Sequence, residues 1–199
     1  MRIGPRFRAN CSNIMVNGEP LSWVKKTKFL GVTILSCSNF MCDWHEARSN
    51  YYKTTNAILS NLGSNPPIDV VLKLTNSKCL PILMYGMAAV TISPKELARM
   101  SFAYNSVIWK LFGVKSKDDI AFVQYYCNCL EFSHLVNYNR FCFLNKLHCK
   151  GHLNSCLKID EPDMNDLVNL SNMYKLQHSD STFSVKNKIW NFVESSMFL

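Results

Sequence analysis

A chain of 199 residues with 48% hydrophobic and 18% charged residues can bury a core, so we expect one ordinary domain or two small ones. The nine cysteines lack the even spacing of a disulfide framework, and no apolar signal stretch follows the basic N-terminus. The longest apolar run, residues 79–92, is too short to cross a bilayer. These features argue against a secreted or membrane-bound protein and predict a reducing compartment, nuclear or cytoplasmic.

The net charge of +8 is uneven along the chain. Residues 1–80 hold ten Lys or Arg against four acids, whereas residues 81–199 hold twelve against ten. Because lysine and arginine neutralise phosphates, a polyanionic partner is expected along the first eighty residues. A solvated basic surface is the commoner explanation of such charge, and composition leaves both alternatives open.

Residues 12–24 are typical of a β-hairpin, because two short alternating segments flank Asn17-Gly18, a strong two-residue turn signal. Residues 29–35 are predicted as a third extended segment with Gly31 inside it, where glycine indicates a bulge or a close approach by another backbone. Three strands are too few for a stable sheet, so we expect them to depend on a partner.

From Asp43 onward the apolar residues recur at helical spacing. A capping box of Asp43 and Glu46 predicts the start of a helix that runs from Trp44 to Leu62. Further helices are predicted at residues 68–80 with a kink and a continuation to 85, and at 93–113, 116–130, 133–147, 163–176 and 185–193. The predicted fold class is mainly α with a small N-terminal antiparallel hairpin and strand unit, an α+β chain.

Asp118-Asp119 is the only pair of adjacent aspartates, and paired aspartates hold Mg²⁺ in two-metal phosphoryl transfer. The pair follows Ser116 at a predicted helix start, however, where acids stabilise the helix dipole. No earlier strand offers a third carboxylate, so we predict no catalytic residue. His45 and His134 are single histidines near helix starts, and we expect them at the surface or as caps.

A second group of residues is typical of metal ligands: Cys142, His148, Cys149, His152 and Cys156. The spacing Cys149-x2-His152-x3-Cys156 offers three ligands to zinc. It fits no closed zinc finger, and an isolated buried cysteine behaves as a small hydrophobic residue. We therefore expect ordinary packing here, with no metal and no cofactor.

Cations and aromatic residues gather around residues 25–53. Lysine and arginine contact phosphates, and an aromatic residue or a glycine lets a sugar or base approach closely. The predicted nucleic-acid-binding residues are Lys25, Lys26, Lys28, Phe29, Leu30, Gly31, Arg48, Tyr52 and Lys53. The alternative is a lysine-rich edge strand that deters aggregation, and composition does not separate the two.

Five short motifs occur in a fixed order: MRIGPR (1–6), IMVNGEPL (14–21) followed by Val24, KFLGV (28–32), LPILMYG (80–86) and RFCFL (140–144). Together they resemble the C-terminal part of reverse transcriptases of non-LTR retrotransposons of the LINE, Jockey-like kind. The likeness spans roughly residues 1–147. It implies that Lys28, Phe29, Leu30 and Gly31 form a primer-grip hairpin, that residues 44–62 are the first thumb helix, and that residues 80–86 serve packing.

The implied domains are residual palm strands over residues 1–42, a thumb-like helical bundle over 43–113 and a C-terminal helical extension over 114–199. The implied function is that of a fragment of an RNA-directed DNA polymerase that keeps the primer-grip and thumb contacts. Since the family's catalytic aspartates would lie upstream of Met1, the chain is not expected to be an enzyme by itself.

The resemblance also implies two partners. One is an RNA–DNA hybrid or duplex nucleic acid, bound weakly and without sequence preference, and the other is a missing palm and fingers domain. The alternative function is a stand-alone basic helical module that binds nucleic acid or protein, with or without zinc at the cysteine–histidine group.

Overall fold

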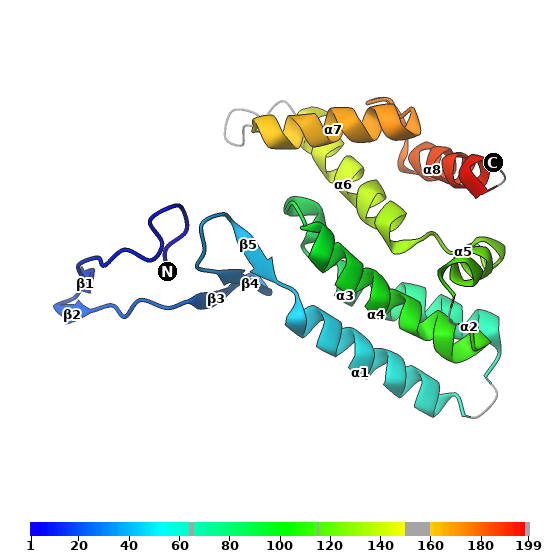
Figure 1. Ribbon diagram of the computed structural model, residues 1–199, viewed down its shortest axis with the longest axis horizontal. Coiled ribbons are helices and arrows are strands. Elements are labelled where there is room, and N and C mark those ends of the chain that lie inside the picture. Colours follow the sequence, from blue (N-terminus) through cyan, green and yellow to red (C-terminus); the bar gives the residue numbers. More distant parts are fainter. Residues whose placement is uncertain (64–65, 115, 150–159, 198–199) are drawn as a thin grey trace.

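The computed structural model describes residues 1–63, 66–114, 116–149 and 160–197. Short antiparallel strands lie at the N-terminal end of the molecule, and helices make up the rest (Figure 1). The predicted fold class, mainly α with a small β unit, is confirmed. Within the described residues, no helix combines the length and the apolar character needed to cross a bilayer.

The first hairpin is formed by β1 (Met15–Val16) and β2 (Glu19–Pro20), which pair antiparallel. Asn17 and Gly18 join them with φ of 52° and 85°, the positive values that a tight two-residue hairpin turn requires. The predicted hairpin is confirmed, although its strands are only two residues long and fully exposed. It projects away from the helices (Figure 1).

A second, three-stranded sheet has the order β3-β4-β5 and is antiparallel throughout. Its strands are β3 (Lys26–Phe29), β4 (Val32–Leu35) and β5 (Met41–Asp43). The prediction of one extended segment over residues 29–35 is wrong, because Leu30 and Gly31 have φ of 46° and 82° and reverse the chain. The glycine therefore serves a tight turn and not a bulge in a strand.

The helix α1 (His45–Asn61) follows directly on β5. Its predicted capping box is wrong: the His45 N–H donates to Asp43 Oδ1 at 2.9 Å, and the Glu46 side chain turns to Lys28 instead. Trp44 is buried just before the helix, and Tyr51 and Thr55 face the core one turn apart.

The next helical stretch is continuous over residues 68–84 but changes its winding. It comprises α2 (Ile68–Leu74), the π-helical segment η1 (Thr75–Cys79) and α3 (Leu80–Met84). Pro81 is the second residue of α3, directly after the π-helical segment, and has no N–H to donate to the preceding turn. The predicted continuation past Pro81 is confirmed, and the irregularity lies just before the proline. A short 3₁₀ segment, η2 (Met87–Ala89), follows.

The remaining helices are α4 (Pro94–Phe112), α5 (Lys117–Tyr126), α6 (Phe132–Cys149), α7 (Glu161–Tyr174) and α8 (Thr182–Met197). Ser93 caps α4 by accepting from the Glu96 N–H, as its sequence predicts. The helix α5 ends four residues before the predicted end, since the chain turns at Asn128 with a φ of 54°.

Two hydrophobic cores hold the helices together. The first packs α1 to α4 around Tyr51, Leu83 and Met100, and Phe132 of α6 reaches into it. The second lies between α6, α7 and α8 around Leu144 and Ile189. Figure 1 shows the two groups of helices with α6 running between them.

Candidate nucleic-acid interface

Two distant segments, the β3–β4 turn and the end of α3, meet at the surface. Tyr85 Oη donates a hydrogen bond to the carbonyl oxygen of Leu30 at 3.0 Å. A Cβ built on Gly31 would lie 3.1 Å from Tyr85 Cε1, and one built on Gly86 would lie 2.9 Å from Val32 Cγ2. Each glycine thus leaves room for a side chain of the other segment, so the two segments fit each other closely.

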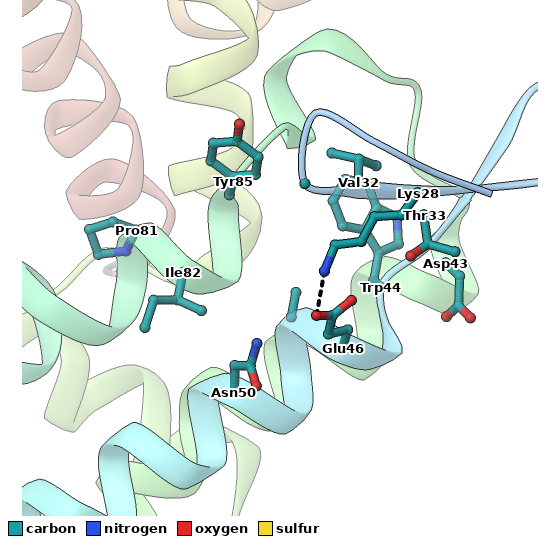
Figure 2. A pocket seen from close by; sticks show the side chains of 12 residues that line it. Lys28, Val32, Thr33, Asp43, Trp44, Glu46, Asn50, Pro81, Ile82 and Tyr85 are labelled. Carbon is teal, nitrogen blue, oxygen red and sulfur yellow. Dashed lines mark hydrogen bonds and ion pairs between the residues drawn. The ribbon is translucent and has the colours of Figure 1, made fainter.

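A pocket of about 410 Å³ opens between this turn, α1 and α3 (Figure 2). Its wall on the sheet side is Lys28 with Val32, and its wall on the helix side includes Ile82 and Tyr85. Trp44, which is buried, contributes an aromatic surface. The lining is mostly apolar, with a few polar groups at one side, the usual character of a small binding pocket.

Lys28 does not point freely to solvent. Its Nζ lies 2.6 Å from Glu46 Oε1, and both side chains are about half exposed, at 54% and 53%. Figure 2 shows this ion pair spanning from the strand to the start of α1. An exposed pair of this kind adds about 0–1 kcal/mol to stability. Its larger effect is to neutralise one of the four predicted lysine contacts.

Lys25 and Lys26 are more available. Both are exposed, and the structure records no ion pair for either within the described residues. Lys26 and Lys28 lie on one face of β3, since alternate residues of a strand share a face. Thr33 pairs with Lys28 in the sheet and with Asp43 on its other side, so an acid shares this face with the lysines. The face therefore carries less net positive charge than the sequence suggests.

Arg48 forms an ion pair within the fold and does not face solvent freely. Its Nη1 lies 2.8 Å from Glu96 Oε2, and each side chain is only 18% exposed, so the pair joins α1 to α4. Tyr52 lies one turn further along α1, is half-buried against the first core, and has a pKa that burial raises. Lys53 is exposed. Of the predicted contacts on α1, only Lys53 is left as an open cation.

The tip of the β3–β4 hairpin presents apolar side chains to solvent. Phe29 is 63% exposed and Leu30 is 76% exposed. More large apolar residues are exposed in the same part of the chain, namely Ile3, Ile14, Met15, Val16, Leu21, Trp23, Val24, Phe40 and Met41. Gathered apolar side chains at a surface mark interaction sites. More than half of the large apolar residues that are exposed in the described chain thus lie in its first 41 positions.

The other candidate groups are placed as follows. Asp118 and Asp119 are exposed in the first turn of α5, and the Asp119 N–H donates to Ser116 Oγ at 3.5 Å. Cys142 packs against the second core, and burial raises its pKa. The residues at 152 and 156 lie outside the described ranges. Every described cysteine is free.

His134 was expected at the surface or as a helix cap, and neither expectation is right. The side chain is half-buried beside the second core, with its ring 5.8 Å from that of Tyr174 and 6.0 Å from that of Phe192. The spacing of α6 explains the difference, since His134 lies one turn before Tyr138 on the face that meets α7 and α8. His45 is exposed, as expected.

The contact between Leu30 and Tyr85 is one that sequence reasoning missed. Both segments carry a glycine next to an aromatic or large apolar residue, yet nothing in their spacing indicates that they touch.

In comparisons with known proteins, no family model, no curated protein and no solved structure matches the chain.

Proposed function

We propose that this chain contacts a template–primer duplex, as the primer-grip and thumb region of an RNA-directed DNA polymerase of the non-LTR retrotransposon kind. One observation carries this function. The turn of Leu30 and Gly31 is held against Tyr85 and Gly86, so the two segments on which the family resemblance chiefly rests form a single surface feature.

The chemistry of the hairpin suits a nucleic-acid backbone. Lys25 and Lys26 reach phosphates, and the exposed Phe29 and Leu30 at the tip offer apolar contact to a sugar or base. Lys53 adds a cation on α1. Contacts of this kind bind without regard to sequence and weaken steeply with salt. The expected ligand is therefore an RNA–DNA hybrid or duplex, bound weakly.

The ion pairs of the structure show which of the predicted cations are available to bind a phosphate. Lys28 and Arg48 each already face a carboxylate, Glu46 and Glu96. If the cation leaves its carboxylate to bind a phosphate, the lost attraction to the carboxylate offsets part of the attraction to the phosphate. We therefore assign the main phosphate contacts to Lys25, Lys26 and Lys53, and a lesser one to Lys28.

We assign no reaction to this chain. Asp118 and Asp119 lie on a helix start and the Asp119 N–H is used in the cap of α5, an arrangement that suits the helix dipole. Two-metal phosphoryl transfer instead needs carboxylates held together on a rigid frame. The proposed role is to hold the duplex.

The test is a fluorescence-anisotropy titration of the whole chain with a labelled RNA–DNA hybrid at several salt concentrations. The double change Lys25→Ala with Lys26→Ala should flatten the slope of log affinity against log salt by about 1.8, since each phosphate contact on duplex contributes about 0.9. Lys28→Ala should flatten it by about half a unit or less.

The matched control is Lys146→Ala with Lys186→Ala, two exposed lysines on α6 and α8 that remove equal charge far from the hairpin. This control should leave most of the slope in place. Equal losses from the two double variants would show that the binding is generic charge attraction and would remove the support for a gripping hairpin.

The exposed apolar residues of the first 41 positions favour a second candidate, a module that docks on another protein such as a palm domain. Hydrogen exchange separates the two. Addition of the hybrid should slow the exchange of β3 and β4 amides if the hairpin grips nucleic acid. Unchanged exchange at saturating hybrid would favour the protein-binding module.

A further inference from the structure

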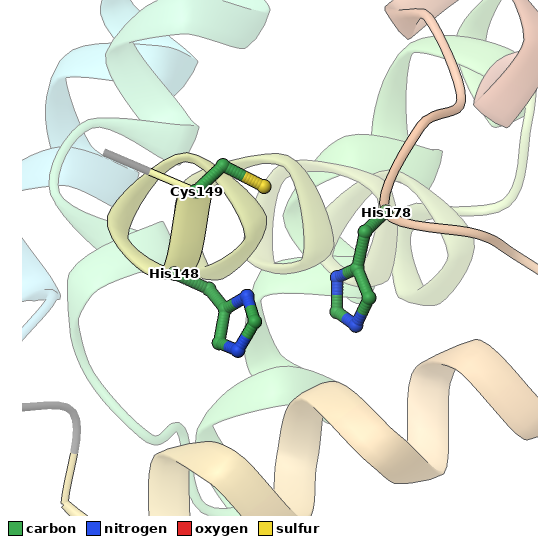
Figure 3. A group of neighbouring side chains, drawn as sticks. All are labelled: His148, Cys149 and His178. Carbon is green, nitrogen blue, oxygen red and sulfur yellow. The ribbon is translucent and has the colours of Figure 1, made fainter. Parts of the chain in front are cut away.

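A group of metal-binding side chains lies far from the hairpin, at the C-terminal end of α6. His148 and Cys149 are the last residues of that helix in the described chain, and His178 lies in the loop between α7 and α8. Their ligand atoms all lie within 4.8 Å of one another, and all three side chains are exposed (Figure 3). The fold thus brings together residues that are 29 positions apart in the sequence.

These atoms lie up to about 1.5 Å further apart than zinc requires. With bonds of about 2.3 Å to sulfur and about 2.0–2.1 Å to nitrogen, ligand atoms around a tetrahedral zinc lie roughly 3.3–3.6 Å apart. The rings of His148 and His178 are now stacked, with centroids 4.7 Å apart and planes at 17°. Binding requires the rings to turn their nitrogens toward a common point. Exposed side chains can make that turn at little cost.

Asn145 prepares His178 for such a role. It lies one turn before Cys149 on α6, its Nδ2 donates to the His178 carbonyl oxygen at 3.1 Å, and its Oδ1 lies 2.7 Å from His178 Nδ1. An amide oxygen can only accept, so Nδ1 carries the proton and Nε2 keeps a free lone pair. A histidine ligand usually donates its second ring N–H to an oxygen in this way.

The Cys149 thiol contacts the same amide oxygen, with Sγ 3.6 Å from Asn145 Oδ1. This S–H bond belongs to the metal-free chain and is lost when the thiolate forms, so in a metal-bound site Asn145 supports His178 alone. The contact from His178 Nδ1 to Asn145 is the one that a bound metal would retain.

We propose that His148, Cys149 and His178 form an open, three-ligand site for a borderline-soft divalent cation, with zinc as the natural occupant and Asn145 as its outer-shell support. Imidazole and thiolate ligands together suit Zn²⁺, and three protein ligands leave a fourth position for water. Binding displaces the thiol proton to solvent. The site would fasten the α7–α8 loop to the end of α6.

Spacing along the chain could not indicate this site. The sequence offers the ligand pattern Cys149-x2-His152-x3-Cys156, whereas the group seen here takes its third member from beyond α7. The site also does not depend on the proposed contact with a template–primer duplex, since it lies on α6 and the α7–α8 loop, whereas that contact lies on the β3–β4 hairpin and α1.

The experiment is a titration of the reduced whole chain with Co²⁺ alone, followed by displacement with Zn²⁺. We expect equimolar binding with a thiolate-to-cobalt charge-transfer band. Cys149→Ser should remove the band, whereas Cys11→Ser, at another exposed cysteine, should keep it. His178→Ala should weaken binding about tenfold or more, and Asn145→Ala by about tenfold.

The control for the histidine change is His45→Ala, at an exposed histidine at the start of α1. Circular dichroism checks the fold of each variant, and His178→Gln replaces His178→Ala if the latter loses helicity. Absence of equimolar binding would overturn the site. So would binding that Cys149→Ser abolishes while both His178 variants leave its affinity and spectrum unchanged, since the ligands would then be local to residues 148–156.

Discussion

Tyr85 Oη donates a 3.0 Å hydrogen bond to the carbonyl oxygen of Leu30, across 55 positions of sequence. The bond ties the tip of the β3–β4 hairpin to the end of α3. Because Tyr85 is 58% exposed, water competes for both groups, and the bond adds little to global stability. Its effect is to set the angle of the hairpin against the helices, and with it the direction in which Phe29 and Leu30 point.

Tyr85→Phe should therefore loosen the hairpin without unfolding the chain. We expect the free energy of unfolding to fall by about 0.5–1 kcal/mol, while hydrogen exchange speeds up over residues 26–35. Mass spectrometry of peptides covers this region. Tyr126→Phe, at a tyrosine that is 78% exposed on α5, is the control and should leave that exchange unchanged. Equal exchange in the wild type and Tyr85→Phe would show that the glycine contacts alone hold the hairpin.

The glycine contacts give a second prediction. Gly86→Ala places a methyl group 2.9 Å from Val32 Cγ2 at a φ of 75°, so it combines a steric clash with backbone strain. Gly113→Ala has a similar φ of 66° but open space around the new methyl group. The control should cost about 1 kcal/mol from strain alone. Chemical denaturation should show a clearly larger loss for Gly86→Ala, and equal losses would mean that the two segments do not pack tightly.

A third prediction concerns pH. Burial lowers the pKa of His134 below its ordinary value of 6.5, and the geometry agrees. Asn137 Nδ2 donates to Tyr174 Oη at 2.8 Å, which leaves the Tyr174 hydroxyl to donate to His134 Nδ1 at 2.7 Å. A protonated Nδ1 would be a donor that faces the donating hydroxyl of Tyr174, so the hydrogen bond between the two side chains would be lost.

The sign follows from which state binds the proton more readily. The unfolded chain takes up the His134 proton at a higher pH than the folded chain, so stability is full above pH 6.5 and falls as the pH drops below it. Denaturation at pH 7.5, 6 and 5 should show this loss, and His134→Gln should reduce it. His45→Gln, at an exposed histidine, serves as the control. An unchanged pH slope in His134→Gln would contradict the assignment.

The fourth prediction concerns Arg140, a cation that is only 7% exposed at the junction of η2, α6 and α7. It binds Asp163, lies 3.1 Å from Asp166, and donates to the carbonyl oxygen of Ala88 at 2.9 Å. Arg140→Met should destabilise the chain by about 2–3 kcal/mol, less than a fully buried pair would cost because both aspartates reach solvent.

Arg99→Met is the matched control for that change, since Arg99 also pairs with an acid, Glu96, but is half exposed. Its loss should cost about 0.5 kcal/mol or less. Thermal or chemical denaturation of both variants measures the difference. Similar losses in the free energy of unfolding for the two variants would mean that Arg140 does not help to hold η2, α6 and α7 together.

The helices could be predicted because their signals are local. Ser93 with Pro94 and Glu96 specifies the start of α4 through a hydrogen bond that spans three residues. The hairpin at Asn17-Gly18 is similarly local, since both turn residues tolerate positive φ. By contrast, Leu30 adopts a φ of 46° that is unusual for its residue type, so the second turn was not evident from the residues themselves.

The candidate site was only partly predictable, because charge in a sequence does not show its partners. Lys28 and Arg48 were assigned as phosphate contacts, yet each faces an acid, one of them 48 positions away. The same limit hid His178, which joins Cys149 only once α7 has folded back over α6. Local rules predict caps and turns, whereas the availability of a cation or a ligand depends on tertiary contacts.

The π-helical segment Thr75–Cys79 makes the position of Tyr85 sensitive to the number of residues that precede it. Val71, Thr75, Cys79 and Leu83 are all buried at steps of four residues. In a regular α-helix each such step overshoots a full turn by about 40°, so the stripe would drift out of the core. The wider π winding takes up one surplus residue and offsets that drift. Loss of a single residue here would rotate everything beyond it by about 100° and shift it by about 1.5 Å, including Tyr85. The contact between Tyr85 and the hairpin thus depends on the number of residues in the π-helical segment before it.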